Sequence, residues 1–203
     1  MITRVNKLTG RLIRLISLVV LQYNPSLKSQ LAFIHETITI FGHCEKEISV
    51  DLINALIEIE DKRFFKHSGV DVYSIARAFL KYISGGRLEG ASTITQQLVR
   101  NVTGAREINL KRKVREILFS TLISKEFSKD EILLAYLNTY KFNGCIGAAA
   151  FCQNESYDWS NLSISQAAEI AARFKYPTLL RSNYVKYLKR VRIIEMKITT
   201  ISA

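Results

Sequence analysis

The amino-acid sequence predicts a mainly α-helical fold. Apolar residues recur at spacings of three and four through nearly every segment, and the alternation typical of half-buried strands is scarce. The chain contains only two prolines, and no repeat or low-complexity linker divides it. With 203 residues, 48% of them hydrophobic, it is long enough to bury the core of one domain, to which a smaller lobe can be attached.

Start and stop signals support the helices that we expect beyond residue 50. Gly85 and Gly86 follow the second helix and favour its termination, and Pro177 interrupts the chain before the last one. The N-terminal signals are capping-box patterns, formed by Ser128 with Glu131 and by Ser163 with Gln166. The expected helices span residues 51–60, 72–83, 93–101, 110–125, 129–139, 164–173 and 184–199.

The first 48 residues form a basic segment that we expect to associate with a membrane, ahead of a folded domain at 49–203. No acidic residue occurs between Met1 and His35. An apolar run from Leu15 to Leu21 is too short to span a bilayer, which takes about 20 apolar residues. The pattern favours an amphipathic helix at the membrane interface over a degenerate signal anchor, and a core helix with basic neighbours remains open. The basic residues of this stretch are Arg4, Lys7, Arg11, Arg14 and Lys28.

The formal net charge of +11 at pH 7 indicates an acidic partner. Nucleic acid, an anionic membrane surface and a phosphorylated substrate are the classes that qualify. The sequence has neither zinc-finger spacing nor the aromatic–basic alternation of single-strand binders, so we expect no nucleic-acid partner.

The cysteines are Cys44, Cys145 and Cys152, without a CxxC pair or a histidine at metal-ligand spacing. A structural zinc site is therefore not expected. Packing in the core is the favoured role, and a bridge between Cys145 and Cys152 is the alternative in an oxidising compartment.

A charged run, EDKRFFKHSG from Glu60 to Gly69, directly follows the apolar helix expected at 51–60. The helix dipole disfavours a carboxylate at the C-terminal pole, and partial burial favours its protonated form, so Glu60 is a candidate general base or acid. Lys62, Arg63 and His67 supply counter-charge. For this run alone, a solvated turn that caps a core helix is the competing interpretation.

The polar run GASTITQQ, from Gly90 to Gln97, lies between helical segments and carries no charge. We expect Gly90 to permit a close backbone approach, and Ser92 or Thr93 to cap the next helix. The amides of Gln96 and Gln97 suit a sugar or a peptide carbonyl. A plain N-cap with surface glutamines is the alternative.

A third run, RKVRE from Arg112 to Glu116, lies on the helix expected at 110–125. Taken alone, it is typical of a solvated helix face with local ion pairs.

In order along the chain, EDKRFFKHSG, GASTITQQ, RKVRE and KDEILLAYLN (Lys129 to Asn138) resemble the signature motifs of the peptidoglycan glycosyltransferases of glycosyltransferase family 51. The resemblance extends from about Asp51 to about Pro177. This family includes the glycan-polymerising domain of class A penicillin-binding proteins and the monofunctional biosynthetic transglycosylases. It implies a lysozyme-like helical large lobe with a smaller membrane-facing jaw lobe, on the periplasmic face of a bacterial inner membrane.

The resemblance further implies that lipid II is polymerised onto a growing glycan strand through β-1,4 bonds, with inversion and release of undecaprenyl diphosphate. Glu60 matches the family's catalytic glutamate, the general base on the acceptor hydroxyl. Glu116 matches a second glutamate that assists the leaving group or donor, where a divalent Mg²⁺ or Mn²⁺ ion is an optional cofactor. A diphosphate leaves without a proton, so cations replace the carboxylic acid of a hydrolase. The implied substrate-binding positions are Asp61, Arg63, Phe64, His67, Arg77, Ser92, Gln96, Gln97, Arg100, Arg112 and Lys113.

The partners implied are lipid II, the glycan strand, an anionic membrane surface and other cell-wall synthesis proteins. The chain departs from the family pattern at Leu134, where glutamate is usual, and in the stretch from Thr139 to Gly147. These departures keep two alternatives open. One is a divergent, non-catalytic copy that binds anionic lipid or glycan, and the other is a lysozyme-like enzyme that cleaves glycan.

Overall fold

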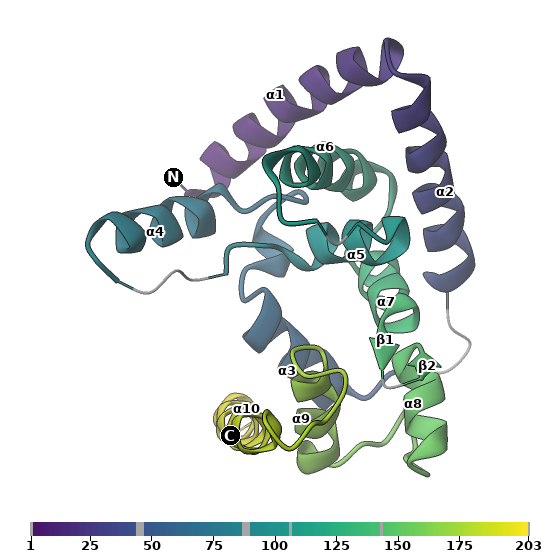
Figure 1. Ribbon diagram of the computed structural model, residues 1–203, viewed down its shortest axis with the longest axis vertical. Coiled ribbons are helices and arrows are strands. Elements are labelled where there is room, and N and C mark those ends of the chain that lie inside the picture. The colour runs from purple at the N-terminus through teal and green to yellow at the C-terminus, as the bar shows by residue number, and fades with distance from the viewer. Residues whose placement is uncertain (1, 44–46, 87–89, 106, 143, 203) are drawn as a thin grey trace. The chain divides into compact units, whose positions relative to one another are not determined.

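The computed structural model describes residues 2–43, 47–86, 90–105, 107–142 and 144–202, and over them it confirms a mainly helical fold (Figure 1). The elements are α1 (Ile2–Gln22), α2 (Pro25–Phe41), α3 (Val50–Glu60), the short 3₁₀ helix η1 (Phe64–Lys66), α4 (Val72–Ile83), α5 (Ile94–Thr103), α6 (Leu110–Glu126), α7 (Lys129–Thr139), β1 (Lys141–Phe142), β2 (Cys145–Ile146), α8 (Ala148–Asn154), α9 (Ile164–Arg173) and α10 (Tyr184–Ser202).

The chain forms two compact units. The first unit comprises Met1–His43 and Arg63–Tyr136, and the second comprises Cys44–Lys62 and Leu137–Ala203. The N-terminal helices thus belong to the same unit as α4, α5 and α6. The division into 1–48 and 49–203 and the membrane association of the first 48 residues both stay predictions.

The first unit is built around α6. This helix packs against α1 and α5, and α2 packs against both α1 and α5. The core between them is apolar, with fully buried side chains from α2, α5 and α6: Ile34, Ile38, Leu98, Phe119 and Ile123. Asn24 starts α2, since its side chain accepts a hydrogen bond from the amide of Leu27 over 3.1 Å.

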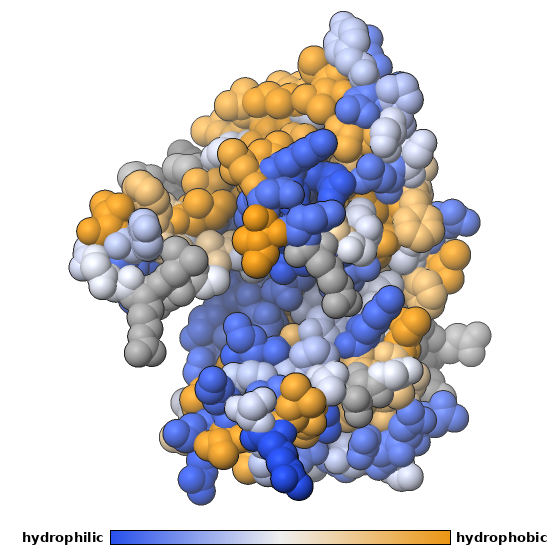
Figure 2. Space-filling view, in the orientation of Figure 1, coloured by the Kyte–Doolittle hydropathy of each residue, from blue (hydrophilic) through white to orange (hydrophobic). Residues whose placement is uncertain are grey.

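The helix α1 has one face on the protein and another in solvent. Asn6, Ser17 and Leu21 are buried, and the Ser17 hydroxyl lies 3.5 Å from the carbonyl of Leu118 on α6. Hydrophobic residues gather on its outer side (Figure 2), where Leu8, Leu12, Leu15, Ile16, Leu18 and Val19 are exposed. Among the described residues, none of the helices combines the length and the apolar character needed to cross a bilayer.

In the second unit, α3, α9 and α10 pack against one another. The buried face of α9 is rich in small side chains, which allow close helix approach: Ala167, Ala168, Ala171 and Ala172. The β1–β2 hairpin is antiparallel and pairs Lys141 with Ile146 and Phe142 with Cys145. The Phe142 ring is fully buried and lies 5.0 Å from the rings of Tyr140 and Phe174, centroid to centroid.

Cys145 and Cys152 are both free, so the bridge between them is wrong. Cys152 is buried, as expected for core packing, and burial raises the pKa of its thiol to about 11. Cys145 is only partly buried, and its sulfur accepts a hydrogen bond from the Asn154 amide. Cys44 lies outside the described residues.

The cap signals were correct at both predicted capping boxes. The hydroxyl of Ser128 accepts from the amide of Glu131, whose carboxylate accepts from the amide of Ser128. Ser163 and Gln166 form the same reciprocal pair at the start of α9. The close approach expected at Gly90 was wrong, because a Cβ atom there would meet nothing within 4 Å.

Candidate active site

Glu60 is the last residue of α3, as the sequence predicted, and an arginine from α10 holds it. Arg190 Nη2 donates a hydrogen bond of 2.7 Å to Glu60 Oε1. The Glu60 side chain is 14% exposed and that of Arg190 is 24% exposed, so the pair is shielded from most of the solvent but still accessible to it. Two positions earlier, Glu58 pairs with Lys62 and, over 3.1 Å, with Lys197 of α10. The end of α3 is therefore fixed by charges from the C-terminal helix.

Asp61 is the C-cap residue of α3 and is buried. Its backbone amide donates to the carbonyl of Ile57, which completes the last turn of the helix. Asp61 therefore has a structural position at the helix end, next to Glu60 in the sequence.

Three predicted substrate-binding residues of the first motif belong to the first unit and make structural contacts there: Arg63, Phe64 and His67. Arg63 Nε donates to Asp71 Oδ2 over 2.9 Å, and its guanidinium lies 4.7 Å from the centre of the Tyr73 ring. Phe64 is fully buried, and His67 is buried nearby, with their rings 6.4 Å apart. Both side chains support the loop instead of lining an open surface.

A glycine at the end of the first motif allows the loop to touch α6. Gly69 has φ +84°, and a Cβ atom there would lie 2.1 Å from the carbonyl oxygen of Ser120. The carbonyl of Gly69 accepts a hydrogen bond of 2.6 Å from Thr93 Oγ1. Thr93 is also the N-cap of α5, where its hydroxyl accepts from the amide of Gln96. One threonine thus connects the first motif to the second.

Glu116 lies at the centre of a cluster of cations. It is 1% exposed and accepts from Arg100 through two nitrogens, Nε at 2.8 Å and Nη2 at 3.3 Å. Arg112 Nη1 donates to the same carboxylate, and Lys113 Nζ lies 3.5 Å from its Oε2. Three cations surround this one carboxylate, so the cluster carries an excess of positive charge.

The cluster fixes the ionisation of its members. Burial alone would raise the pKa of Glu116, but the hydrogen bond and charge of Arg100 and the charges of Lys113 and Arg112 outweigh it and hold the pKa below its ordinary value. Burial, followed by the charges of Arg100 and Arg112, lowers the pKa of Lys113 even though Glu116 opposes this shift. Glu116 is therefore an anion at neutral pH and a poor proton donor.

The second motif meets this cluster through Lys113. The Lys113 ammonium donates to Ser92 Oγ over 2.9 Å and to Gln96 Oε1 over 2.7 Å. Gln97 lies further from the cations, and its Oε1 accepts from the Tyr136 hydroxyl of α7. The structure thus brings together six predicted residues: Ser92, Gln96, Arg100, Arg112, Lys113 and Glu116.

Arg77 is placed elsewhere in the first unit, exposed on α4. Sequence reasoning missed Arg190 and Asp71. Nothing distinguishes Arg190 from the other basic residues of the last helix, and 130 positions separate it from Glu60. Asp71 did carry a signal, since it precedes a predicted helix and acts as its N-cap toward the amide of Tyr73.

The donors around Glu116 do not suit a metal ion. A divalent cation in an oxygen site takes several carboxylate or carbonyl ligands, whereas here one carboxylate is already shared by three cations. Within the described part of the chain, no group of three or more histidine, cysteine, aspartate and glutamate side chains is arranged to hold a metal.

Comparison with known proteins identifies the family. A family model described as Transglycosylase matches residues 39–199. Penicillin-binding protein 1A of Rickettsia conorii is 43% identical over 147 residues, which cover 68% of this chain and 19% of that protein. Its namesake from Clostridium tetani is 35% identical over 162 residues, which cover 73% of this chain and 20% of that protein. The chain thus spans about a fifth of the length of these relatives. Because the family model covers more than half of its residues, the chain belongs to the transglycosylase family.

Proposed function

We propose that this chain is a peptidoglycan glycosyltransferase that polymerises lipid II into β-1,4-linked glycan strands and releases undecaprenyl diphosphate. The observation that carries the proposal is the excess of cations around Glu116, within the segment that matches the family. The penicillin-binding proteins 1A, with which the chain shares 35–43% identity in the comparisons above, support the same reaction class.

Glu60 is the proposed general base. Its carboxylate accepts the proton of the acceptor sugar's 4-hydroxyl as that oxygen attacks the anomeric carbon of the donor. The bond to the diphosphate breaks with its electron pair, and the configuration inverts from α to β. Arg190 fixes the direction of the Glu60 carboxylate through its hydrogen bond of 2.7 Å.

Arg100, Arg112 and Lys113 are the proposed partners of the diphosphate. The leaving group accumulates negative charge as the bond breaks, and fixed cations stabilise that charge without reorganising. In this proposal Glu116 holds the three cations in place, because it contacts each of them. Ser92 and Gln96 position Lys113 through its ammonium group.

A lysozyme-like cleaving enzyme needs a carboxylic acid that protonates the leaving oxygen. Glu116 does not fit that role, since its pKa is held below the ordinary value by the surrounding cations. Glu116 is therefore not available as the acid of a cleaving enzyme.

The proposal places the chain at the outer, periplasmic face of a bacterial inner membrane, where lipid II and the growing strand are present. Its basic charge suits an anionic membrane surface, and other cell-wall synthesis proteins are proposed partners.

The test is polymerisation of labelled lipid II in detergent by the purified chain. We expect long glycan from the natural sequence, and inhibition by moenomycin, the inhibitor associated with this family. Glu60→Gln should abolish polymer formation, whereas Glu155→Gln, which changes an exposed carboxylate at the end of α8, should retain it. Release of reducing-end sugars from preformed glycan, without use of lipid II, would instead identify a cleaving enzyme. A folded chain that makes no polymer would contradict the proposal.

A further inference from the structure

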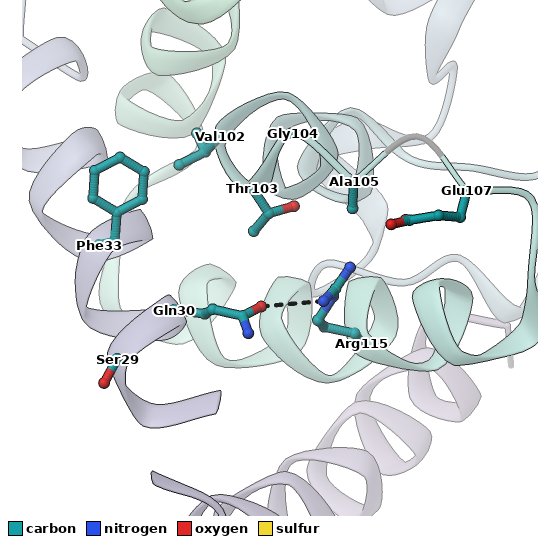
Figure 3. Close-up of a pocket in the computed structure, with 9 residues that line it drawn as sticks. All are labelled: Ser29, Gln30, Phe33, Val102, Thr103, Gly104, Ala105, Glu107 and Arg115. Carbon is teal, nitrogen blue, oxygen red and sulfur yellow. Dashed lines mark hydrogen bonds between the residues drawn. The ribbon is translucent and has the colours of Figure 1, made fainter. Parts of the chain in front are cut away.

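Two cavities in the first unit lie next to each other and share two lining residues. The first has a volume of about 460 Å³ and lies between α2, the end of α5 and α6 (Figure 3). The second has a volume of about 730 Å³ and is lined by α1, α2 and α6. Gln30 of α2 and Arg115 of α6 line both cavities. We call this pair of cavities the α2–α6 groove.

One part of the α2–α6 groove is apolar. The apolar lining of the second cavity comes from Val20 of α1, Leu27 of α2 and three residues of α6, namely Leu110, Val114 and Leu118, and the polar side chains of Asn24 and Ser26 line it as well. Leu110 is 79% exposed and Val114 is 46% exposed, although both border a hollow surface. Leaving such an apolar concavity in water is unfavourable, so a hydrocarbon chain is a suitable occupant.

The other part of the groove carries charges of both signs. Arg115 rises from α6 into the first cavity, and Glu107 points into it from the segment that follows α5 (Figure 3). The Arg115 guanidinium donates to Gln30 Oε1 over 3.3 Å, which fixes it at the junction of the two cavities. Lys111 adds a second cation along the apolar part. The last turn of α5, which ends at the left-handed cap Gly104, also borders this part and presents the negative pole of a helix.

On α6 the groove and the cations around Glu116 use different faces, and they meet at one point, where Arg112 Nε donates to the backbone carbonyl of Glu107. Arg112, Lys113 and Glu116 form the cluster described above. The groove is lined by residues at helical spacings of three and four on another face: Lys111, Val114, Arg115 and Leu118. Occupation of the groove is therefore a question distinct from the transferase reaction.

We propose that the α2–α6 groove binds one bilayer phospholipid with a zwitterionic headgroup that contains a phosphate and a primary ammonium. The acyl chain would lie against Leu27, Val114 and Leu118, and the phosphate against Arg115 and Lys111. The ammonium would face Glu107 and the C-terminal pole of α5. Along the groove the apolar residues come first, Arg115 lies where the two cavities meet, and Glu107 lies beyond it. The acyl chain, the phosphate and the ammonium follow one another in the same order in such a lipid. Each cavity volume falls in the range of about 300–1,000 Å³ that is usual for small-molecule sites. The exposed leucines of α1, the helix that contributes Val20, extend the apolar surface next to the groove.

The experiment is a titration of the purified full chain with dihexanoyl phosphatidylethanolamine below its micelle-forming concentration, followed by calorimetry. Because the probe is then monomeric, general partition into a bilayer does not contribute. We expect saturable binding of one lipid. Arg115→Gln should weaken it about tenfold or more, the factor that loss of one hydrogen bond to a charged group brings. Val114→Glu should weaken it at least as much, because it places a carboxylate against the hydrocarbon.

Matched controls are available on exposed positions of the second unit. Arg181→Gln and Val185→Glu make the same chemical changes and should leave the affinity unchanged. Far-ultraviolet circular dichroism checks that each variant is folded. If Val114→Glu does not fold, the conservative Arg115→Gln variant still decides the question, because its side chain remains polar and of similar length.

The headgroup is tested by phosphatidylglycerol of the same chain length, which lacks the ammonium. It should bind more weakly to the natural sequence, and Glu107→Gln should remove the difference between the two lipids. Equal binding of both lipids, or no effect of Arg115→Gln and Val114→Glu, would overturn the proposal. Complete, competitive displacement of the bound phospholipid by a polyprenyl diphosphate would also overturn it, because the groove would then belong to the substrate.

Discussion

Asn6 and Asp71 form a hydrogen bond of 3.2 Å that connects the first helix of the chain to the N-cap of α4. Both side chains are buried. Asp71 Oδ2 also accepts from Ser74 over 2.7 Å and from Arg63 over 2.9 Å, so three side chains converge on one carboxylate. The beginning of the chain, the first motif and α4 are thereby joined at a single residue.

Asp71 should make the stability of the first unit dependent on acid pH. Burial alone would raise the pKa of Asp71, but the hydrogen bonds of Ser74 and Asn6 and the charge of Arg63 hold it below the ordinary value. Since the folded-state pKa is depressed, the stabilisation is complete above the unfolded-state pKa of about 3.9 and is lost as the pH falls through the lower folded-state pKa. Asp71→Asn should lower the free energy of unfolding by about 1–3 kcal/mol at pH 7 and weaken its decline in acid.

Urea unfolding at a series of pH values measures this effect. Asp130→Asn changes an exposed aspartate on α7 and should leave the acid dependence as it is in the natural sequence. Equal acid dependence in the natural sequence and Asp71→Asn would show that the carboxylate does not have this role.

Gly69→Ala should be strongly destabilising. The new Cβ atom would lie 2.1 Å from the carbonyl oxygen of Ser120, and a backbone φ of +84° is itself unfavourable for alanine. We expect a loss of about 2 kcal/mol or more in the free energy of unfolding. Gly90→Ala is the matched control, because nothing lies within 4 Å of its Cβ position, and it should be close to neutral. Thermal unfolding of the two variants should therefore separate them clearly, and similar midpoints would contradict the close contact at Gly69.

Arg190 is expected to act as a positioning residue for Glu60. Arg190→Gln removes the ionic partner of the carboxylate and should lower kcat for lipid II polymerisation about tenfold, with little change in KM. Arg190→Lys should restore part of kcat, since a cation is regained without the planar guanidinium. Steady-state kinetics with Arg192→Gln, an exposed neighbour, provide the control. A change in KM alone would assign Arg190 to binding and not to the position of the base.

Arg112 is expected to act on the diphosphate. Arg112→Gln removes one of the cations around Glu116 and should lower kcat about 100-fold, the usual order for one donor that stabilises developing charge. Lys125→Gln, at the exposed end of the same helix, should have no effect on kcat. Single-turnover rates with lipid II are the measurement. A loss that disappears at saturating lipid II would indicate that Arg112 contributes only to ground-state binding.

The sequence predicted the helices best where local signals were complete. The expected ranges of α4, α7 and α9 match the structure at both ends, because apolar spacing, caps and glycines there all act within a few residues. The short helix α8 and the β1–β2 hairpin were not predicted. The hairpin has two residues in each strand, which is too few to show a period.

In the candidate site, too, only the contacts between residues close together in the sequence could be predicted. The contacts of Arg112 and Lys113 with Glu116 follow from helical spacing, and sequence analysis considered them as local ion pairs. Arg100 joins them from another helix, and Arg190 reaches Glu60 from the far end of the chain. Such contacts depend on how helices pack, and a single sequence contains no local pattern for them.

The use of two faces of α6 has a thermodynamic consequence. Arg112 and Arg115 are three positions apart on one helix, so a displacement of α6 at one face is felt at the other. If a ligand on one side changes the affinity for a ligand on the other, the second must change the affinity for the first by the same factor. A diphosphate at the Glu116 cluster and a phospholipid in the α2–α6 groove would then report on each other, and the lipid composition of the surrounding bilayer would enter the energetics of substrate binding.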